Sequence, residues 1–163
     1  MPLEIERRFL VDGDAWRAAA RHRELYAQGY LAGSEPCSVR VRVGGDHAWL
    51  GLKGRLSGTT RLEYEYEIPV RDAQEILGSL CAHGRVEKWR HWVPHGGHEW
   101  EVDEFLGDNS GLVVAELELD AEDEPFAHPV WLGPEVTEDA RYLNSSLARH
   151  PWRSWPEAER AAR

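Results

Sequence analysis

The sequence has little of three features that would each point to a particular class of protein. It holds only two cysteines, Cys37 and Cys81, which are too few for a disulfide-stapled fold and are not spaced as metal ligands. It contains no apolar run long enough to span a membrane, and residues 1–11 are charged where a secretion signal would be apolar. We therefore expect a cytoplasmic protein with reduced thiols and no membrane partner.

An excess of positive charge is also missing. The formal net charge is -10, and proteins that bind nucleic acid present basic faces, so we expect no nucleic-acid partner. Net charge says little about one cavity, however, and a small polyanion can still bind at a local cluster of cations. The length of 163 residues fits one domain with its own core. We place that domain at residues 1–151 and a charged, proline-containing C-terminal tail at residues 152–163.

Eight stretches alternate apolar and polar residues with the period of a β-strand. They cover about residues 3–11, 25–31, 37–44, 47–54, 60–69, 85–93, 98–106 and 112–120. Short turns such as Gly44-Gly45-Asp46 and His95-Gly96-Gly97 separate several of them, and tight links favour antiparallel neighbours. Closure would leave no exposed edge. We predict an α+β, mainly β protein, a closed eight-stranded antiparallel β-barrel with a few flanking helices.

Three further stretches have the pattern of helices. Asp14 is placed to cap a short helix over residues 15–21. Residues 71–83 carry an apolar stripe and are followed by Gly84 as a stop signal. Thr137 is placed to cap a helix that extends to about Leu147. For the tail we consider two states, a mobile segment or one that lies against the barrel end through Trp152 and Trp155.

Charged residues lie on one face of most predicted strands, and their sign differs from strand to strand. Carboxylates come from residues 3–11, 60–69, 98–106 and 112–120, whereas cations come from residues 37–44, 47–54 and 85–93. The commonest cause of such alternation is a sheet with one solvated face, but a solvated face usually mixes or pairs the two signs. In a closed barrel, the Glu-x-Glu pairs on distant strands would converge in a polar interior.

A tunnel with carboxylates on some walls and Lys or Arg on others suits a metal–polyphosphate complex. Carboxylate oxygens bind Mg²⁺ or Mn²⁺, which prefer hard oxygen ligands. Arginine binds phosphate oxygens through its bidentate fork, and lysine binds them as a point charge. Phosphoryl transfer requires mainly positioning and neutralisation of charge. The sequence therefore predicts a cavity that binds a small polyanionic triphosphate together with Mg²⁺ or Mn²⁺.

Several motifs occur in the order found in one known family. They are Glu4-Ile5-Glu6-Arg7-Arg8, Gln28-Gly29-Tyr30-Leu31, Val39-Arg40-Val41-Arg42, Leu52-Lys53-Gly54, Arg61-Leu62-Glu63-Tyr64-Glu65-Tyr66, Glu87-Lys88-Trp89-Arg90, Trp100-Glu101-Val102-Asp103, Ala115-Glu116-Leu117-Glu118 and Gly133-Pro134-Glu135-Val136-Thr137. Each motif is weak alone, but their order over about residues 3–151 resembles the CYTH superfamily of triphosphate tunnel metalloenzymes. The likeness is greatest to short bacterial members, several of which are inorganic triphosphatases.

The resemblance implies a triphosphate bound inside the barrel and assigns roles to the charged residues. The catalytic set that it implies is Glu4, Glu6, Arg8, Glu63 and Glu65. The implied phosphate-binding residues are Arg8, Arg40, Arg42, Lys53, Lys88 and Arg90. The implied metal ligands are Glu4, Glu6, Glu63, Asp103, Glu116 and Glu118. Which carboxylate holds which ion, and which one orients the attacking water, stays open.

The chain departs from the family signature at Arg8, where the pattern has lysine. Arginine keeps the positive charge but does not release a proton near neutral pH. If the family lysine only binds phosphate, the exchange changes little, and we favour this interpretation. Tyr30 shares a strand face with Gln28, and we leave open whether it points into the tunnel.

The predicted reaction is metal-dependent hydrolysis of inorganic tripolyphosphate to pyrophosphate and phosphate. Four alternatives remain: a class IV adenylate cyclase, an organic triphosphatase acting on nucleoside or thiamine triphosphate, a non-catalytic polyphosphate-binding module, and a plain barrel with a solvated face. A homodimer also stays open. We assign no metal to His95 and His98, since histidines beside a turn are usually solvated.

Overall fold

The computed structural model describes residues 2–33, 37–57 and 59–161. Within these ranges the elements are β1 Leu3–Val11, α1 Trp16–Ala19, β2 His22–Gly33, β3 Ser38–Gly44, β4 His47–Ser57, β5 Thr60–Glu67, α2 Val70–Ser79, β6 Arg85–His95, β7 His98–Phe105, β8 Val113–Leu119, β9 Leu132–Glu135, α3 Asn144–Arg149 and α4 Glu157–Ala161. Short 3₁₀ turns lie at Gly107–Asn109, Ala140–Tyr142 and Trp152–Ser154. All eight predicted strands are present, and β9 is a strand that the sequence pattern did not predict.

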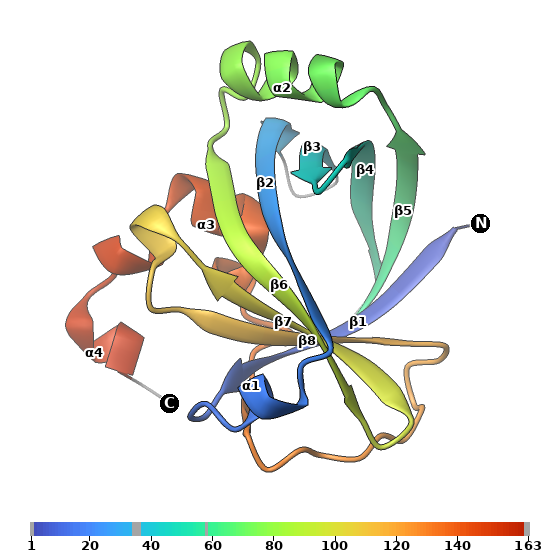
Figure 1. Ribbon diagram of the computed structural model, residues 1–163, viewed down its shortest axis with the longest axis vertical. Helices are drawn as coiled ribbons and strands as arrows, with labels where there is room; N and C mark the ends of the chain where they lie inside the picture. Colours follow the sequence, from blue (N-terminus) through green and yellow to red (C-terminus); the bar gives the residue numbers. More distant parts are fainter. Residues whose placement is uncertain (1, 34–36, 58, 162–163) are drawn as a thin grey trace.

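The strands form one antiparallel sheet in the order β5-β4-β3-β2-β6-β7-β8-β1-β9 (Figure 1). Strand β1 also pairs with β5, through Leu3 opposite Leu62 and Glu4 opposite Arg61, and this pairing closes an eight-stranded barrel. Strand β9 lies outside the ring and pairs with the end of β1. The prediction of a closed eight-stranded antiparallel barrel is therefore confirmed.

The β6–β7 hairpin shows how the local sequence determines part of this topology. Strand β6 ends at His95 and β7 begins at His98, so the connection consists of Gly96 and Gly97 alone. Both glycines have positive φ, +59° and +82°, which a two-residue turn matched to the twist of the strands requires. The predicted tight antiparallel link is thus present at this position.

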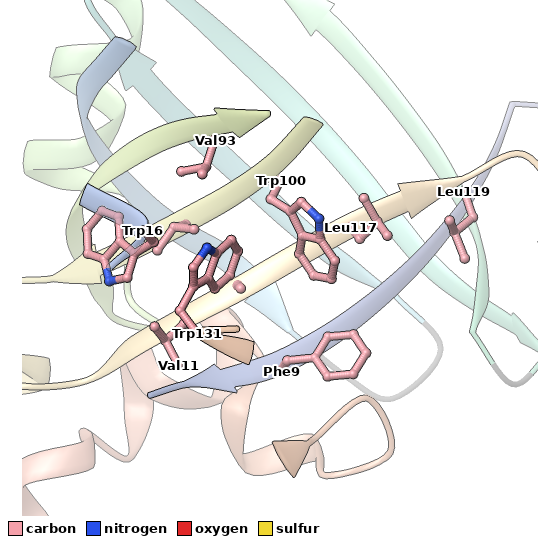
Figure 2. Close-up of a cluster of buried hydrophobic side chains, with 10 residues drawn as sticks. Phe9, Val11, Trp16, Val93, Trp100, Leu117, Leu119 and Trp131 are labelled. Carbon is pink, nitrogen blue, oxygen red and sulfur yellow. The ribbon is translucent and has the colours of Figure 1, made fainter. Parts of the chain in front are cut away.

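Apolar residues cover the outer side of the barrel in two places. Figure 2 shows the larger cluster, in which Phe9, Trp16, Trp100, Leu117 and Trp131 are buried together. These side chains come from β1, α1, β7, β8 and the segment that leads into β9. The second cluster lies where Ala73 and Leu77 of α2 pack on Val41 and Ala48 of β3 and β4.

A third cluster occupies one end of the barrel interior. Leu10, Val86, Phe105 and Val114 belong to β1, β6, β7 and β8, and each shares its strand face with the charged residues of its strand. They pack with Leu147 of α3 and with Tyr142 and Trp155. The predicted polar interior is therefore interrupted at this end by an apolar plug, to which the C-terminal segment contributes.

The predicted helices differ from the structure in their ends. Helix α1 is shorter than predicted, and its N-cap is Ala15 rather than Asp14. Helix α2 ends at Ser79, before Gly84. The helix predicted over residues 137–147 is divided into the 3₁₀ turn Ala140–Tyr142 and α3, because Leu143 between them has extended backbone.

Thr137 does not cap a helix, since its hydroxyl accepts a hydrogen bond from Arg8 N of β1 at 3.0 Å. In the tail, Trp155 packs edge to face on Tyr142, and Trp152 N donates to Asn109 Oδ1 at 2.8 Å. Of the two states considered for the tail, the described part takes the packed one. The domain boundary after residue 151 stays a prediction. In the described part of the chain, no helix has the length and apolar character needed to cross a bilayer.

Candidate active site

The barrel encloses a cavity of about 560 Å³ whose wall is mostly polar. Its lining consists of Glu4, Glu6, Arg8, Tyr30, Ser38, Arg40, Arg42, Gly51, Leu52, Lys53, Arg61, Glu63, Glu65, Lys88, Arg90, Glu99, Glu101, Glu116, Glu118, Asp120, Leu143, Asn144 and Ser145. Every residue that the sequence predicted for the site lies in this wall, with the exception of Asp103. The alternation that predicted a charged interior face is therefore present in the folded chain.

The order of strands around the barrel sorts the two signs of charge into opposite halves. Strands β7, β8, β1 and β5 are consecutive in the ring and supply most of the carboxylates. Strands β4, β3, β2 and β6 complete the ring, and three of them supply cations, while β2 supplies Tyr30. The exceptions on the acidic half are Arg8 and Arg61. One half of the wall is thus suited to cations and the other half to phosphate oxygens.

The acidic half is built on the pairing of β1 with β8. Glu6 lies opposite Glu118 and Arg8 lies opposite Glu116 in the register. Arg8 is buried; its Nη2 donates to Glu6 Oε1 at 2.7 Å and its Nε donates to Glu116 Oε1 at 3.2 Å. Arg8 therefore holds two carboxylates of neighbouring strands together, in addition to any contact it makes with substrate.

These carboxylates have opposite electrostatic environments. Burial, reinforced by the nearby carboxylates Glu116 and Glu4, raises the pKa of Glu6 to about 7. Burial also opposes ionisation of Glu116, but Arg8 and Arg90 outweigh it and hold the pKa of Glu116 well below its usual range. Burial and the neighbouring Glu4 raise the pKa of Glu118 as well. The cations of this wall therefore stabilise the charge of Glu116, whereas burial and neighbouring carboxylates disfavour the charges of Glu6 and Glu118.

The carboxylates of β5 face the cations of β3 and β4. Lys53 Nζ lies 2.5 Å from Glu4 Oε2 and 3.4 Å from Glu63 Oε2, so it links β4 to both β1 and β5. Glu65 Oε2 accepts hydrogen bonds from Nη2 of Arg40 and from Nη2 of Arg42, each at 3.3 Å. The two arginines are thus brought to one point on the cavity wall, where they can bind the same anion.

Strand β6 contributes two cations that a buried carboxylate holds in place. Lys88 Nζ donates to Asp103 Oδ2 at 2.6 Å, and Arg90 forms a bidentate pair with Asp103 at 2.8 Å to each oxygen. Arg90 also reaches Glu116 Oε2 at 3.3 Å. Burial, together with the adjacent Arg90, lowers the pKa of Lys88 to about 8.

Asp103 is placed differently from the metal contact that the resemblance implied. It is fully buried behind Lys88 and Arg90, does not line the cavity, and uses both oxygens on these two cations. Its geometry is that of a residue that orients the side chains of Lys88 and Arg90. Asp103 therefore contributes to the site through Lys88 and Arg90.

The structure also brings residues to the site that the sequence analysis did not select. They are Ser38, Arg61, Glu99, Glu101, Asp120, Asn144 and Ser145. Glu101 and Glu99 could have been found from the period of two that joins them to Asp103. Nothing local marks Asn144, which reaches the barrel from α3. Tyr30, left open above, does line the cavity, and its hydroxyl oxygen accepts a hydrogen bond from Gln28 Nε2 at 3.1 Å.

The donor set of the acidic half fits a divalent cation by its chemistry. Among the described residues, the cavity wall holds nine carboxylates and seven cations, and burial together with the charges of Glu116 and Glu4 raises the pKa of Glu6. Hard oxygen donors in excess of positive charge are what Mg²⁺ and Mn²⁺ require. Within the described ranges, no three His, Cys, Asp or Glu side chains already converge as a ligand set. Glu4 and Glu6 would have to turn from Lys53 and Arg8 towards the ion.

Two histidines and two tyrosines of the barrel strands lie away from this cavity. His98 Nε2 lies 2.9 Å from Glu124 Oε1, and His91 packs edge to face on Trp16 outside the barrel. The tyrosines Tyr64 and Tyr66 of β5 are exposed on the outer face. None of these four residues lines the cavity.

The chain is similar to known proteins over nearly its whole length. The CYTH domain model matches residues 2–150. An inorganic triphosphatase of Acetivibrio thermocellus is 50% identical over 157 residues, which is 96% of this chain and 100% of that protein. An inorganic triphosphatase of Nitrosomonas europaea is 38% identical over 154 residues, 89% of this chain and 96% of that protein. A solved structure of an inorganic triphosphatase has a TM-score of 0.63 at 35% identity and covers 91% of this chain and 96% of that one. The family match and these identities over nearly the whole chain show that this protein belongs to the CYTH domain family.

Proposed function

We propose that this protein hydrolyses the terminal phosphoanhydride bond of inorganic tripolyphosphate, giving pyrophosphate and phosphate, with Mg²⁺ or Mn²⁺ bound beside the substrate. The observation that carries the proposal is the division of one enclosed cavity into an acidic half and a cationic half. A plain solvated face does not need closure, and a simple anion site does not need the carboxylates.

The charge of the cavity supports a requirement for metal. With nine carboxylates against seven cations in the wall, a bare polyanion would meet net repulsion in a site of low dielectric constant. Divalent ions reverse this balance, neutralise the charge on the phosphate oxygens and act as Lewis acids. The residues placed to hold them are Glu4 and Glu6 of β1, Glu116 and Glu118 of β8, and Glu63 of β5.

The cationic half would bind the phosphate chain. Arg40 and Arg42 already converge on one acceptor, Glu65 Oε2, and a phosphate oxygen offers the same kind of charge-assisted contact. Lys88 and Arg90 are fixed by Asp103, so little side-chain freedom is lost when they bind. Such preorganised charge is the main catalytic contribution that phosphoryl transfer takes from a protein.

Two considerations favour the inorganic substrate over an organic triphosphate. Tyr30 is the single aromatic side chain among the described residues of the cavity wall, so stacking surface for a base or a thiamine ring is scarce. The relatives with 50% and 38% identity both carry the name inorganic triphosphatase. A class IV adenylate cyclase remains an outcome that the assay below would reveal.

The test is phosphate release from tripolyphosphate, ATP, thiamine triphosphate and pyrophosphate, each measured with Mg²⁺, with Mn²⁺ and with excess EDTA. We expect tripolyphosphate to give the highest kcat/KM and EDTA to abolish turnover. Full activity in excess chelator would refute the metal mechanism. A preference for ATP with cyclic nucleotide as product would replace the proposal with the cyclase.

A matched pair of variants on β5 links the activity to the cavity. Glu65 lines the cavity, whereas Glu67, two residues further along the same strand, is exposed and contacts His47. Glu65→Gln should lower kcat/KM by roughly tenfold or more, because the arginines lose a charged partner that aligns them. Glu67→Gln should change it by less than about twofold, as expected for a surface substitution. Equal effects of the two variants would show that catalysis takes place elsewhere.

A further inference from the structure

Asn144 is the first residue of α3 and lies where the apolar plug meets the cavity. Leu147, one turn further along α3, is completely buried in the plug, while Leu143, Asn144 and Ser145 belong to the cavity wall. The extended backbone of Leu143 separates α3 from the preceding 3₁₀ turn. The C-terminal part of the chain thus closes one end of the cavity and presents a polar side chain there.

The hydrogen bonds of Asn144 determine how its amide is oriented. Its Oδ1 lies 2.9 Å from Lys88 Nζ and 3.1 Å from Gln28 Nε2. A lysine ammonium donates hydrogen bonds and accepts none, so the atom facing Lys88 has to be the oxygen. The Gln28 amide is then oriented in turn, since it can only donate to that same oxygen. The Oδ1 of Asn144 is therefore occupied by two donors from β6 and β2.

The other atom of the amide is available. Within the described ranges, Asn144 Nδ2 makes no hydrogen bond, and it is absent from the polar atoms that are buried without a partner, so it reaches solvent. Because Asn144 lines the cavity, its free amide donor is within reach of a ligand bound there. Nδ2 is a neutral donor held at the end of a phosphate-binding wall, next to Lys88.

We propose that Asn144 is a substrate-binding residue whose Nδ2 donates a hydrogen bond to an oxygen of the phosphate group at the closed end of the cavity. The inference rests on the proposed triphosphate substrate and extends it by adding a contact from α3. Lys88 and Gln28 hold the amide in the donating orientation before substrate arrives. The end of the phosphate chain is thereby recognised by a residue outside the barrel strands.

A purely structural role for Asn144 makes a different prediction, and Asn144→Asp separates the two. Aspartate has the same shape and keeps an oxygen for Lys88 and Gln28, so a structural role would be preserved. It replaces Nδ2 by a second, negatively charged oxygen, which repels phosphate. Asn144→Ala removes both functions. The matched control is Gln74→Glu, the same amide-to-acid change on the exposed surface of α2.

The experiment measures kcat and KM for tripolyphosphate with saturating Mg²⁺. It also measures, by calorimetry in the same saturating Mg²⁺, the dissociation constant of a tripolyphosphate analogue in which NH replaces the bridging oxygens, so that no turnover is expected. We expect KM and the dissociation constant to rise about tenfold in Asn144→Ala, the effect of one hydrogen bond to a charged group. They should rise further, about fiftyfold, in Asn144→Asp, with kcat changed less than about threefold. Gln74→Glu should stay within about twofold of the wild type. Thermal unfolding should show that Asn144→Asp is folded.

Wild-type binding by Asn144→Asp, beside impaired binding by Asn144→Ala, would overturn the inference and leave Asn144 as a support for Lys88. The outcome does not depend on the proposed reaction. A wild-type protein that binds tripolyphosphate but does not hydrolyse it, with binding lost in Asn144→Asp, would refute the proposed function and support the inference. A wild-type protein that binds neither tripolyphosphate nor its analogue in saturating Mg²⁺ would refute both.

Discussion

The raised pKa of Glu6 predicts that the metal-free protein loses stability as the pH rises from 5 to 8. Glu6 is buried beside other carboxylates, and neither the hydrogen bond from Arg8 Nη2, at 2.7 Å, nor the charge of Lys53 offsets these two effects. Burial and the charges of Glu116 and Glu4 raise its pKa from 4.5 to about 7. The perturbation that isolates this effect is Glu6→Gln, which removes the titrating group and keeps the size of the side chain.

The sign follows from proton binding in the two states. Between pH 4.5 and pH 7 the folded protein keeps a proton on Glu6 that the unfolded chain has released, so stability falls as the pH rises through this window. A difference of one pKa unit between the folded and unfolded states corresponds to about 1.4 kcal/mol. The shift of Glu6 therefore lowers the free energy of unfolding by about 3 kcal/mol in total. This is an upper limit, because 14% of the Glu6 side chain remains exposed to water.

The assay is thermal unfolding in EDTA at several pH values, for the wild type and for Glu6→Gln. Other groups titrate in the same range, but those that do not interact with Glu6 are common to both proteins and cancel in the difference. A change of 3 kcal/mol corresponds to about 6–12 °C in Tm for a chain of this length. We expect the Tm of Glu6→Gln minus that of the wild type to increase by up to this amount between pH 5 and pH 8.

Bound Mg²⁺ should offset the loss of stability that ionised Glu6 causes at high pH. If Mg²⁺ binds Glu6, it competes with the proton, so saturating Mg²⁺ should raise the Tm of the wild type more at pH 8 than at pH 5. The control is Glu75→Gln, which changes an exposed carboxylate on α2. Parallel profiles of Tm against pH for the wild type and Glu6→Gln would refute the reasoning and show that the pKa of Glu6 is not raised in the folded protein.

Three further predictions concern the cations and the tail. Arg8→Lys should change kcat by less than about tenfold, while Arg8→Ala should cost about 2 kcal/mol or more in kcat/KM because a charge contact is lost; a hundredfold rise in Arg8→Lys would show that a proton donor is missing in the native protein. Arg40→Ala, Arg42→Ala and Arg90→Ala should each lower kcat/KM by roughly thirtyfold or more, and losses under about threefold at all three would place the site elsewhere. Trp155→Ala should lower the free energy of unfolding by about 3–5 kcal/mol in chemical denaturation, and a change below about 1 kcal/mol would mean that the tail is not part of the folded unit.

Much of the fold was predictable because its signals are local. The period of two located all eight barrel strands, and Gly96 with Gly97 supplied the positive φ values that their hairpin needs. Strand β9 was missed because it is four residues long and contains Gly133 and Pro134, which are uncommon in strands. The helix predicted to begin at Thr137 was wrong at its start, where the Thr137 hydroxyl accepts a hydrogen bond from Arg8 N, a partner more than a hundred residues away, and it is divided by the extended backbone of Leu143.

The site residues, too, were predictable only where the signal was local. Alternation placed Glu4, Glu6, Arg40 and Arg42 on interior faces, because successive side chains of a strand point to opposite sides. The same rule placed Asp103 inside but could not show that Lys88 and Arg90 cover it. It also could not distinguish the charged middle of the interior from the apolar plug, since both lie on the same strand faces.

By itself, the sequence determined the strands, the face on which each charge lies, and the family to which the ordered motifs belong. These properties follow from neighbours one to four residues apart and from the order of residues along the chain. Only the tertiary structure decided that β7, β8, β1 and β5 stand side by side, so that their carboxylates form one wall opposite the cations. It also brought Asn144 of α3 to Lys88 and Gln28. Both arrangements depend on the order of strands distant in sequence and on the docking of a helix. Burial of apolar surface over the whole chain determines them, so the spacing of nearby residues does not predict them.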